Sequence, residues 1–410
     1  MDKTSLGKTS LESNTGPLAG ISVIELCSFI SGPYAGMLLA DLGADVIKIE
    51  RPGEGDDYRR YGKYDSDSPS FIALNRGKRS VTINLRDERA HSLLSKLIAN
   101  CDVLLENFRL GFLDEIGLGY RDVSKMNPGI IYCQISGLGD QGNDSKQPVY
   151  DGVAQARSGL WSNMTSASQG WRLVGPATAD QLAGLFAANG VLGALVARER
   201  TGVGTLVSTD LLSAAVGFLA TSIAEYTVAG VLRGPFDRPQ SSQCFGFQCS
   251  DGKAIGMHLS SPEKFWDRLL DVCERQDLKT DARFALRRDR VVNFDELHAE
   301  LQATFEKRPQ EYWLARLHDE GVPAGALNTI AEALEDPQVV ANGLIGTYGA
   351  GDRVRKLAAS PVRFGDHERT SVAAGFLQGE PNLGEHTRSV LSGLGISDAE
   401  LDSLHNGCVI

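Results

Sequence analysis

One aspartate stands where a carboxylate could act as a nucleophile. Asp180 opens the apolar run DQLAGLFAANGVLGALVAR (180–198), which is hydrophobic on most faces and is predicted to be a buried helix. The run follows residues 137–178, a long irregular stretch rich in Gly, Ser, Asn, Gln and Asp, and long irregular stretches in compact domains are usually functional. Two interpretations remain open: Asp180 caps the helix, or the helix dipole keeps its carboxylate ionised and ready to attack.

Basic residues gather near the ends of the first predicted strands, although the chain carries a net charge of −11. They are Arg51, Arg59, Arg60, Lys63, Lys78 and Arg79. Because the loops that follow parallel strands converge at one edge of a sheet, these side chains could bind the phosphates of a nucleotide. A solvated surface face is the alternative interpretation.

The turn SGPYAG (31–36) precedes a predicted helix, and such a turn can hold a phosphate at the helix N-terminus. It lacks the G-x-G-x-x-G pattern of dinucleotide-binding turns, so ordinary turn chemistry also explains it. Glu50 ends the second predicted strand, where dinucleotide enzymes bind ribose hydroxyls. Arg51 follows at once and suits a phosphorylated ribose better.

The sequence contains no motif that is typical of a metal site or of a serine hydrolase. The seven histidines are isolated, and no H-E-x-x-H, G-x-S-x-G or C-x-x-C motif occurs. Cys244 and Cys249 are spaced C-x4-C, but no second ligand pair follows. We therefore predict no metal site.

Composition places the 410-residue chain among globular proteins, with 42% apolar and 23% charged residues. The negative net charge excludes a global footprint for nucleic acid. We expect no membrane span, since no stretch approaches about 20 apolar residues, and no signal or transit peptide at the polar N-terminus. The odd number of scattered cysteines, seven, is typical of reduced thiols and predicts a cytoplasmic protein.

Short apolar runs alternate with helical patterns along the first half of the chain, which predicts an α/β domain with a mostly parallel sheet. The expected strands are 21–26, 44–50, 80–85, 102–107 and 129–136, and the expected helices are 34–42, 87–99, 180–198, 210–229 and 397–405. A hairpin is expected to turn at Asp251-Gly252.

Composition changes predict the domain boundaries. Residues 1–17 are expected to form a flexible tail, and residues 18–230 the first part of a large domain. The linker-like RGPFDRPQSS (233–242) then leads to a smaller α+β domain, residues 240–330. Residues 340–410 are expected to return to the large domain.

Several motifs resemble one known family. They are GPYAGMLLADLGADVIKIERPGEGD, LNRGKRSVTINL, ENFRLGFLDEIGLGY, YDGVAQARSG, GVPAGALNTIAEALEDPQV and LGEHTRSVLSGLGIS, and they run in order from about residue 18 to the C-terminus. In these motifs the chain resembles the class III CoA-transferases, the family of formyl-CoA transferase and carnitine CoA-transferase. α-Methylacyl-CoA racemases share much of this pattern.

The resemblance implies a Rossmann-like large domain, a small domain and an interlocked homodimer. It implies that Asp180 is the catalytic nucleophile, because the family's aspartate occupies that place. The CoA-binding residues that it implies are Ser28, Ser31, Arg51, Lys78, Asn107 and Phe108, and a backbone amide near the first turn is expected to hold the acyl oxygen. The substrates would be an acyl-CoA and a carboxylic acid, with no tightly bound cofactor and no metal.

Two departures from the family narrow the implied activity. Ile30 stands where formyl-CoA transferase has its active-site glutamine, and the glycine run that covers that enzyme's site is missing from residues 240–250. Tyr150 stands where racemases carry the His of their acid/base pair. We therefore expect CoA transfer from an acyl-CoA to a free acid through aspartyl anhydride and aspartyl-CoA thioester intermediates, with Asp180 ionised at a reference pKa near 3.9. A racemase or epimerase is the alternative, and a catalytically idle CoA-binding protein is a third possibility.

Overall fold

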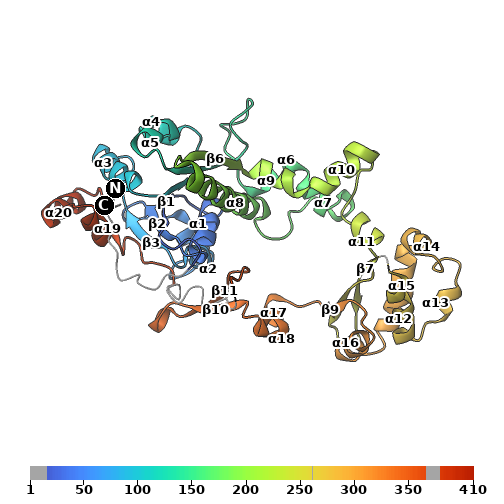
Figure 1. The fold of residues 1–410 in the computed structure, drawn as a ribbon. Coiled ribbons are helices and arrows are strands. Elements are labelled where there is room, and N and C mark those ends of the chain that lie inside the picture. The colour runs from blue at the N-terminus through green and yellow to red at the C-terminus, as the bar shows by residue number, and fades with distance from the viewer. Residues whose placement is uncertain (1–15, 261, 366–378) are drawn as a thin grey trace. The chain divides into compact units, whose positions relative to one another are not determined.

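The computed structural model describes residues 16–260, 262–365 and 379–410. Contacts divide the chain into two compact units, coloured along the chain in Figure 1. The first contains Met1–Leu160, Gly175–Ala220 and Gln338–Ile410, and the second contains Trp161–Val174 and Thr221–Pro337. The predicted tail, residues 1–17, lies outside the described residues except for its last two.

The first unit is built on a six-stranded parallel sheet with the order β3-β2-β1-β4-β5-β6. Its strands are β1 (Ser22–Leu26), β2 (Asp45–Glu50), β3 (Arg79–Thr82), β4 (Val103–Glu106), β5 (Ile131–Ser136) and β6 (Thr205–Asp210). This is the Rossmann order, which reverses between β1 and β4. The predicted α/β class with a parallel sheet is confirmed.

Helices cover both faces of this sheet (Figure 1) because its strands are apolar on both sides. Val23 of β1 packs in one core with α1 (Ser31–Asp41), α8 (Thr178–Thr201) and α9 (Leu211–Phe218). Ile24, the next residue, packs in the other core with α3 (Glu88–Ala99), α5 (Tyr120–Met126), α19 (Thr387–Gly393) and α20 (Asp398–Asn406). Shorter elements of this unit are η1 (Asp57–Arg60), α2 (Pro69–Asn75), α4 (Phe112–Glu115), α18 (Pro337–Ala341), β10 (Ile345–Tyr348), η3 (Gly351–Arg353) and β11 (Arg355–Ala358).

The C-terminal residues complete this unit along β3. Thr387 Oγ1 accepts a hydrogen bond from the Thr82 N–H at 2.9 Å, and the Asn84 N–H donates to the Val409 carbonyl at 2.8 Å. Strand β3 therefore ends at Thr82, short of the predicted residue 85, because Asn84 pairs with the C-terminal segment instead of β2.

Two predictions, one of an irregular stretch and one of a helix, were wrong in part. The stretch 137–178 is not wholly irregular, since it contains α6 (Asp151–Ser158), α7 (Leu160–Met164) and η2 (Ala167–Gln169). The predicted buried helix 210–229 is broken at Leu219 into α9 and α10 (Ala220–Ala229), and α10 has no buried residue. Its apolar composition therefore does not reflect burial within this chain.

Helix α8 is long and apolar enough to cross a membrane, judged by length and composition alone. This differs from the expectation that no stretch approaches that length. Ala183, Ala187 and Val191 of α8 are fully buried and belong to the core that covers the sheet. Such burial is typical of the core helix of a globular domain, which passes the same test.

The second unit contains an antiparallel sheet with the order β7-β8-β9. Its strands are β7 (Cys244–Gln248), β8 (Ala254–His258) and β9 (Ala324–Ala326), and its further helices are α11 (Asp237–Ser241), α12 (Glu263–Cys273), α13 (Asp277–Thr280), α14 (Arg287–Val292), α15 (Phe294–Phe305), α16 (Gln310–Asp319) and α17 (Ile330–Glu335). The hairpin predicted at Asp251-Gly252 is confirmed, with Phe247 opposite Ile255. Alternate residues of β7, Phe245 and Phe247, pack against the helices.

Candidate functional site

A cavity of about 820 Å³ opens in the first unit where the strand order reverses. In open α/β sheets ligands bind at this point, beyond the carboxyl ends of the strands. The volume suits a sizeable organic ligand. Its lining consists of residues 28–31, 107–110, 135–137 and 145–152, with Tyr58, Tyr61, Ala177, Asp180 and Leu211.

Four of the predicted CoA-binding residues meet at this cavity. Ser28 follows β1 and Asn107 follows β4, and the Ser28 N–H donates to Asn107 Oδ1 at 3.0 Å. Asn107 Nδ2 donates to the Ser28 carbonyl at 2.9 Å and to Ser31 Oγ at 3.2 Å. Phe108 lines the same cavity. The reversal of strand order therefore joins two loops that lie about eighty residues apart in the chain.

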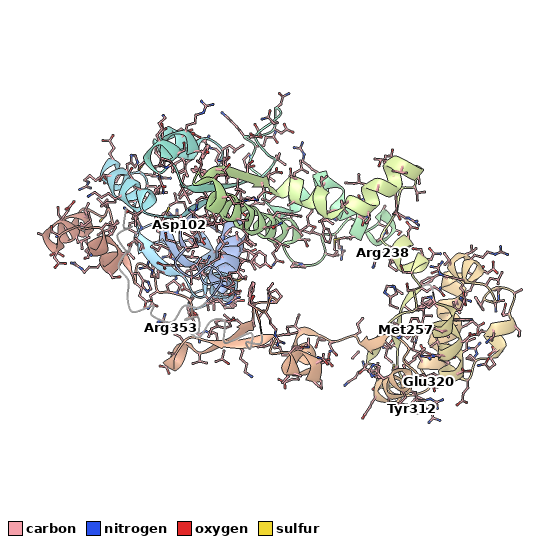
Figure 2. All side chains as sticks on the ribbon, in the orientation of Figure 1. Asp102, Arg238, Met257, Tyr312, Glu320 and Arg353 are labelled. Carbon is pink, nitrogen blue, oxygen red and sulfur yellow. The ribbon has the colours of Figure 1, made fainter. Side chains whose placement is uncertain are left out.

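Asp180 lies at the same cavity, held there by the packing of α8 against α1. A Cβ at Gly184 would come within 2.5 Å of the Ser31 carbonyl oxygen, so only glycine permits this approach. The far end of α8 is held to the sheet by Arg198, whose Nη1 lies 3.1 Å from Oδ1 of Asp102. Figure 2 labels Asp102. Both ends of the helix are therefore fixed relative to β1 and β4.

Asp180 does not cap its helix, so that interpretation of the residue was wrong. Ala177 is the N-cap residue and Asp180 is the third helical residue. Asp151, the first residue of α6, takes the capping role, because its Oδ1 accepts hydrogen bonds from the N–H groups of Ala179 at 2.7 Å and Asp180 at 3.3 Å. Among the residues that the structure describes, the Asp180 carboxylate makes no hydrogen bond or ion pair, so it is available for other chemistry.

The ionisation of Asp180 also differs from the expectation. Burial, and to a smaller extent the negative charge of Asp151, raises the pKa of Asp180 to about 7. The expected reference pKa near 3.9 does not apply, because the cavity wall takes hydration away from the carboxylate. A carboxylate with a pKa near neutrality is a more basic nucleophile than an exposed one.

The other two predicted CoA-binding residues lie away from the cavity lining. Lys78 is fully buried, and its Nζ contacts Glu25 at 2.8 Å, the Pro33 carbonyl at 2.9 Å and Asn75 Oδ1 at 2.9 Å. Burial lowers its pKa to about 8 even though Glu25 raises it. Arg51 is exposed and pairs with Glu54 and Asp57. Of these two side chains, only that of Arg51 is accessible to a phosphate.

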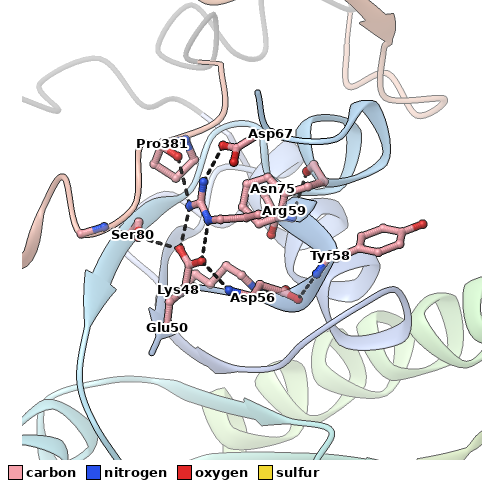
Figure 3. A network of polar contacts seen from close by, with 12 residues as sticks. Lys48, Glu50, Asp56, Tyr58, Arg59, Asp67, Asn75, Ser80 and Pro381 are labelled. Atoms are coloured by element: carbon pink, nitrogen blue, oxygen red, sulfur yellow. Dashed lines mark hydrogen bonds and ion pairs between the residues drawn. The ribbon is translucent and has the colours of Figure 1, made fainter. Parts of the chain in front are cut away.

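Acidic partners neutralise much of the basic cluster that the sequence suggested (Figure 3). Arg59 is buried, and its Nε and Nη2 lie 2.7 and 2.8 Å from the two carboxylate oxygens of Glu50. Asp67 also contacts Arg59 at 2.6 Å, and Arg79 pairs with Asp45. Three of the six basic residues, Arg59, Lys78 and Arg79, are buried in ion pairs. Arg51, Arg60 and Lys63 are exposed, so the cluster is partly a network of buried ion pairs and partly a solvated face.

An aromatic group lines the cavity next to Asp180. Phe29 lies 5.8 Å from Tyr58 and 6.2 Å from Tyr150 between ring centroids, and Tyr58 lies 5.3 Å from Tyr61. The negative charge of Asp180 contributes to the raised pKa of Tyr58, after the larger effect of burial, so the two side chains are electrostatic neighbours. Sequence reasoning did not identify this group, because its members come from three separate loops.

Sequence reasoning also missed the carboxylates that support the site, Asp56 and the capping Asp151. The segment GEGDD gave one weak signal for Asp56, since a carboxylate after glycines often binds backbone N–H groups. Within the described residues, no group of three or more His, Cys, Asp or Glu could hold a metal ion.

Comparison with known proteins identifies the family. The model of CoA-transferase family III matches residues 18–387. This chain belongs to that family. It is 35% identical to the acetyl-CoA:oxalate CoA-transferase of Acetobacter aceti over 80% of this chain and 85% of that protein. It is 34% identical to the succinyl-CoA:glutarate CoA-transferase of Mus musculus, over 92% of this chain and 86% of that protein.

Solved structures agree with this assignment. A CAIB/BAIF family protein from Brucella suis is 32% identical and matches 93% of this chain and all of that chain, with a TM-score of 0.82. Rv3272 from Mycobacterium tuberculosis is 30% identical, with a TM-score of 0.79 over 91% of this chain and 98% of that chain. The family III member described here is therefore a class III CoA-transferase, an acyl-CoA:carboxylate CoA-transferase of EC 2.8.3.-. The formyl-CoA and carnitine subtype does not follow from these matches.

Proposed function

We propose that Asp180 carries the acyl group and then CoA during transfer from an acyl-CoA to a free carboxylic acid. The observation that supports this most is the position of Asp180 at the cavity between β1 and β4, where Asp151 binds its N–H and no described residue binds its carboxylate. Phe29, Tyr58 and Leu211 give the cavity apolar walls, and we propose that these walls keep water from the acyl group during transfer. Exclusion of water protects an acyl intermediate from hydrolysis.

The proposed chemistry needs no external activation. The Asp180 carboxylate attacks the thioester carbonyl, the C–S bond breaks, and CoA thiolate leaves with the electron pair, so that a mixed anhydride forms. The thiolate then attacks the aspartyl carbonyl, which releases the donor acid and leaves an aspartyl-CoA thioester. The acceptor acid repeats both steps in reverse. Each step exchanges one activated acyl bond for another.

Oxyanions form at each attack, and the start of α1 supports their stabilisation. Ile30 and Ser31 line the cavity, and the first N–H groups of a helix lack intrahelical acceptors. One well-placed donor of this kind contributes about 2.7–4 kcal/mol to a transition state. We propose that these amides bind the acyl oxygen.

The CoA-binding residues remain a proposal. Ser28, Ser31, Asn107 and Phe108 are supported by their position in one cavity. Arg51 is supported by its exposed guanidinium, whereas Lys78 would act only indirectly, through the Pro33 carbonyl at the first turn of α1.

We propose short dicarboxylic acids as the acids exchanged, with succinyl-CoA as a donor. The relatives named for oxalate, glutarate and D-citramalate support this class. Lys146 and Arg109 lie in the cavity lining and offer cations to a second carboxylate.

Mass spectrometry after mixing with a panel of acyl-CoA donors tests the proposed nucleophile. We expect a covalent adduct on Asp180, and hydroxylamine added during turnover should convert residue 180 to a hydroxamate. Asp180→Asn should fold, because Asp151 rather than Asp180 caps α8, and should show only background transfer. Transfer activity in Asp180→Asn, or a label on Asp151, would reject the assignment. Incorporation of deuterium from D2O at the α-carbon of the acyl-CoA without an acceptor acid would instead support racemisation.

We also propose the assembly and location that the sequence suggested: a large domain of residues 18–230 and 340–410, a small domain of residues 240–330, an interlocked homodimer, and a cytoplasmic enzyme. Exposed apolar side chains on α8 and α9, such as Phe186, Val196 and Phe218, support a partner surface. The seven free cysteines support a reducing compartment. Light scattering that gives the monomer mass of 44.1 kDa would reject the dimer.

A further inference from the structure

The turn between β1 and α1 contains a residue in an unusual backbone conformation. Phe29 has a φ of 63° and lies in the left-handed region, which side chains other than glycine seldom adopt. Phe29 and the residues on either side of it, Ser28 and Ile30, line the cavity that holds Asp180. Strained residues of this kind persist where the surrounding structure forces them, and they gather at active sites.

Two buried side chains impose this conformation. Asp56 Oδ1 accepts a hydrogen bond from the Phe29 N–H at 3.2 Å, and also from the Tyr58 N–H at 3.0 Å. Asp56 Oδ2 lies 2.9 Å from Lys48 Nζ. The same ammonium donates to the Cys27 carbonyl at 2.8 Å. The Lys48–Asp56 pair therefore holds the backbone on both sides of Ser28.

Asn107 binds both the N–H and the carbonyl of Ser28. Together, Lys48, Asp56 and Asn107 form what we call the clamp on this turn. The backbone from Cys27 to Phe29 is thus held at four polar groups, which are the carbonyl and N–H of the Cys27–Ser28 peptide and those of the Ser28–Phe29 peptide. Because φ of Phe29 sets the direction of the chain into Ile30, the clamp also sets where the first N–H groups of α1 lie.

The rest of the network keeps the clamp rigid. Glu25 lies between the two buried ammonium groups, 3.1 Å from Lys48 and 2.8 Å from Lys78. Glu50 accepts a hydrogen bond from the Asp56 N–H at 3.1 Å and also pairs with Arg59 (Figure 3). Buried ion pairs add little net stability, since desolvation offsets the attraction. A contribution to stability therefore explains this network poorly. A role in holding the turn between β1 and α1 in one conformation explains it well.

We propose that Asp56, oriented by Lys48, is a positioning residue for acyl transfer that holds Phe29 in its left-handed conformation, so that the first N–H groups of α1 meet the acyl oxygen. This inference rests on the proposed function for its chemistry. The clamp itself is a structural claim and can be tested separately.

Asp56→Asn tests the proposal, because it keeps an oxygen acceptor for the Phe29 N–H but removes the charge that pairs with Lys48. We expect kcat to fall about 100-fold, since a small misplacement of reacting groups costs about that much. KM for the acyl-CoA should change less than about threefold, because Ser28 and Asn107 still bind each other. Should Asp56→Asn fail to fold, Lys48→Arg keeps the charge with a different donor geometry and should lower kcat about tenfold.

Asp41→Asn is the matched control. Asp41 is also a buried carboxylate in an ion pair, 2.6 Å from Arg76, but it lies at the opposite end of α1 from the turn. It should lower stability and leave kcat, measured per CoA-binding site, within about twofold of the wild type. An equal loss of kcat in both variants would mean a merely structural role for Asp56 and would overturn the proposal.

Amide hydrogen exchange gives a readout that does not depend on catalysis. Exchange at Phe29 should become at least about tenfold faster in Asp56→Asn and stay unchanged in Asp41→Asn. Unchanged exchange at Phe29, or a kcat within about twofold of the wild type, overturns the proposal. If the wild type transfers no CoA with any donor of the panel, the proposed function fails, while the exchange measurement still decides whether Asp56 holds the turn.

Discussion

The rate of CoA transfer should fall as the pH drops below about 7, because Asp180 becomes protonated; we call this fall the acidic limb of the pH profile. The carboxylate must be ionised to attack a thioester, and its pKa is raised to about 7, first by burial and then by Asp151. About half of the free enzyme is then competent at pH 7 and only about a tenth at pH 6. An exposed aspartate would instead keep its activity down to about pH 4. The difference is large enough to measure in kcat/KM.

Replacing Asp151 with Asn should move this limb to lower pH. The substitution removes the negative charge that disfavours ionisation of Asp180, while the Asn oxygen can still accept the Ala179 N–H. The partner Gln155 can adapt, because its Oε1 is buried without a hydrogen-bond partner among the described residues and can accept from the new amide. The helix cap therefore survives the change.

Glu106 is the necessary control for this experiment. Burial raises its pKa to about 7 as well, and it binds the Phe108 N–H at 2.8 Å beside the cavity. Initial rates at subsaturating acyl-CoA, measured from about pH 5 to about pH 9, should show the same limb in Glu106→Gln as in the wild type. A limb near pH 4, or one that moves in Glu106→Gln but not in Asp151→Asn, would refute the assignment to Asp180.

Three further predictions follow from single contacts. A buried acid whose pKa is raised by folding destabilises the folded protein as the pH rises from the acid's pKa in the unfolded chain to its pKa in the folded chain. In chemical unfolding, Asp180→Asn should therefore be more stable than the wild type by about 2 kcal/mol at pH 8 and equally stable near pH 4. This difference is about half of that expected from the full pKa shift, because part of the carboxylate is hydrated. Gly184→Ala should lower the free energy of unfolding by about 1–3 kcal/mol, since its Cβ would meet the Ser31 carbonyl. Gly193→Ala on the same helix, where a Cβ meets nothing, should raise the free energy of unfolding by about 0.5–1 kcal/mol. Equal effects of the two substitutions would contradict the close approach of α8 and α1. Arg51→Ala should raise KM for the acyl-CoA several-fold with less effect on kcat, and an unchanged KM would make it an ordinary surface residue.

Local patterns in the sequence determined the elements and their layers. Apolar runs such as 21–26 and 129–136 predicted strands, and the helical spacing within 87–99 predicted a helix, because each pattern depends only on residues close together in the chain. The family motifs likewise pointed to Ser28 and Asn107, which the reversal of strand order brings into one cavity.

Only the tertiary structure decided how charged residues are used. The sequence did not reveal that Lys78 is buried and paired with Glu25. It did not reveal that Asp151 caps α8 in place of Asp180. Nor did it reveal that Lys48 and Asp56 hold Phe29. The contacts with Phe29, Ala179 and Glu25 join residues that lie 27, 28 and 53 positions apart along the chain, and they depend also on the loss of hydration that burial brings. A charge has no local periodicity, so its pKa and its partner are set by the fold and not by its neighbours in the sequence.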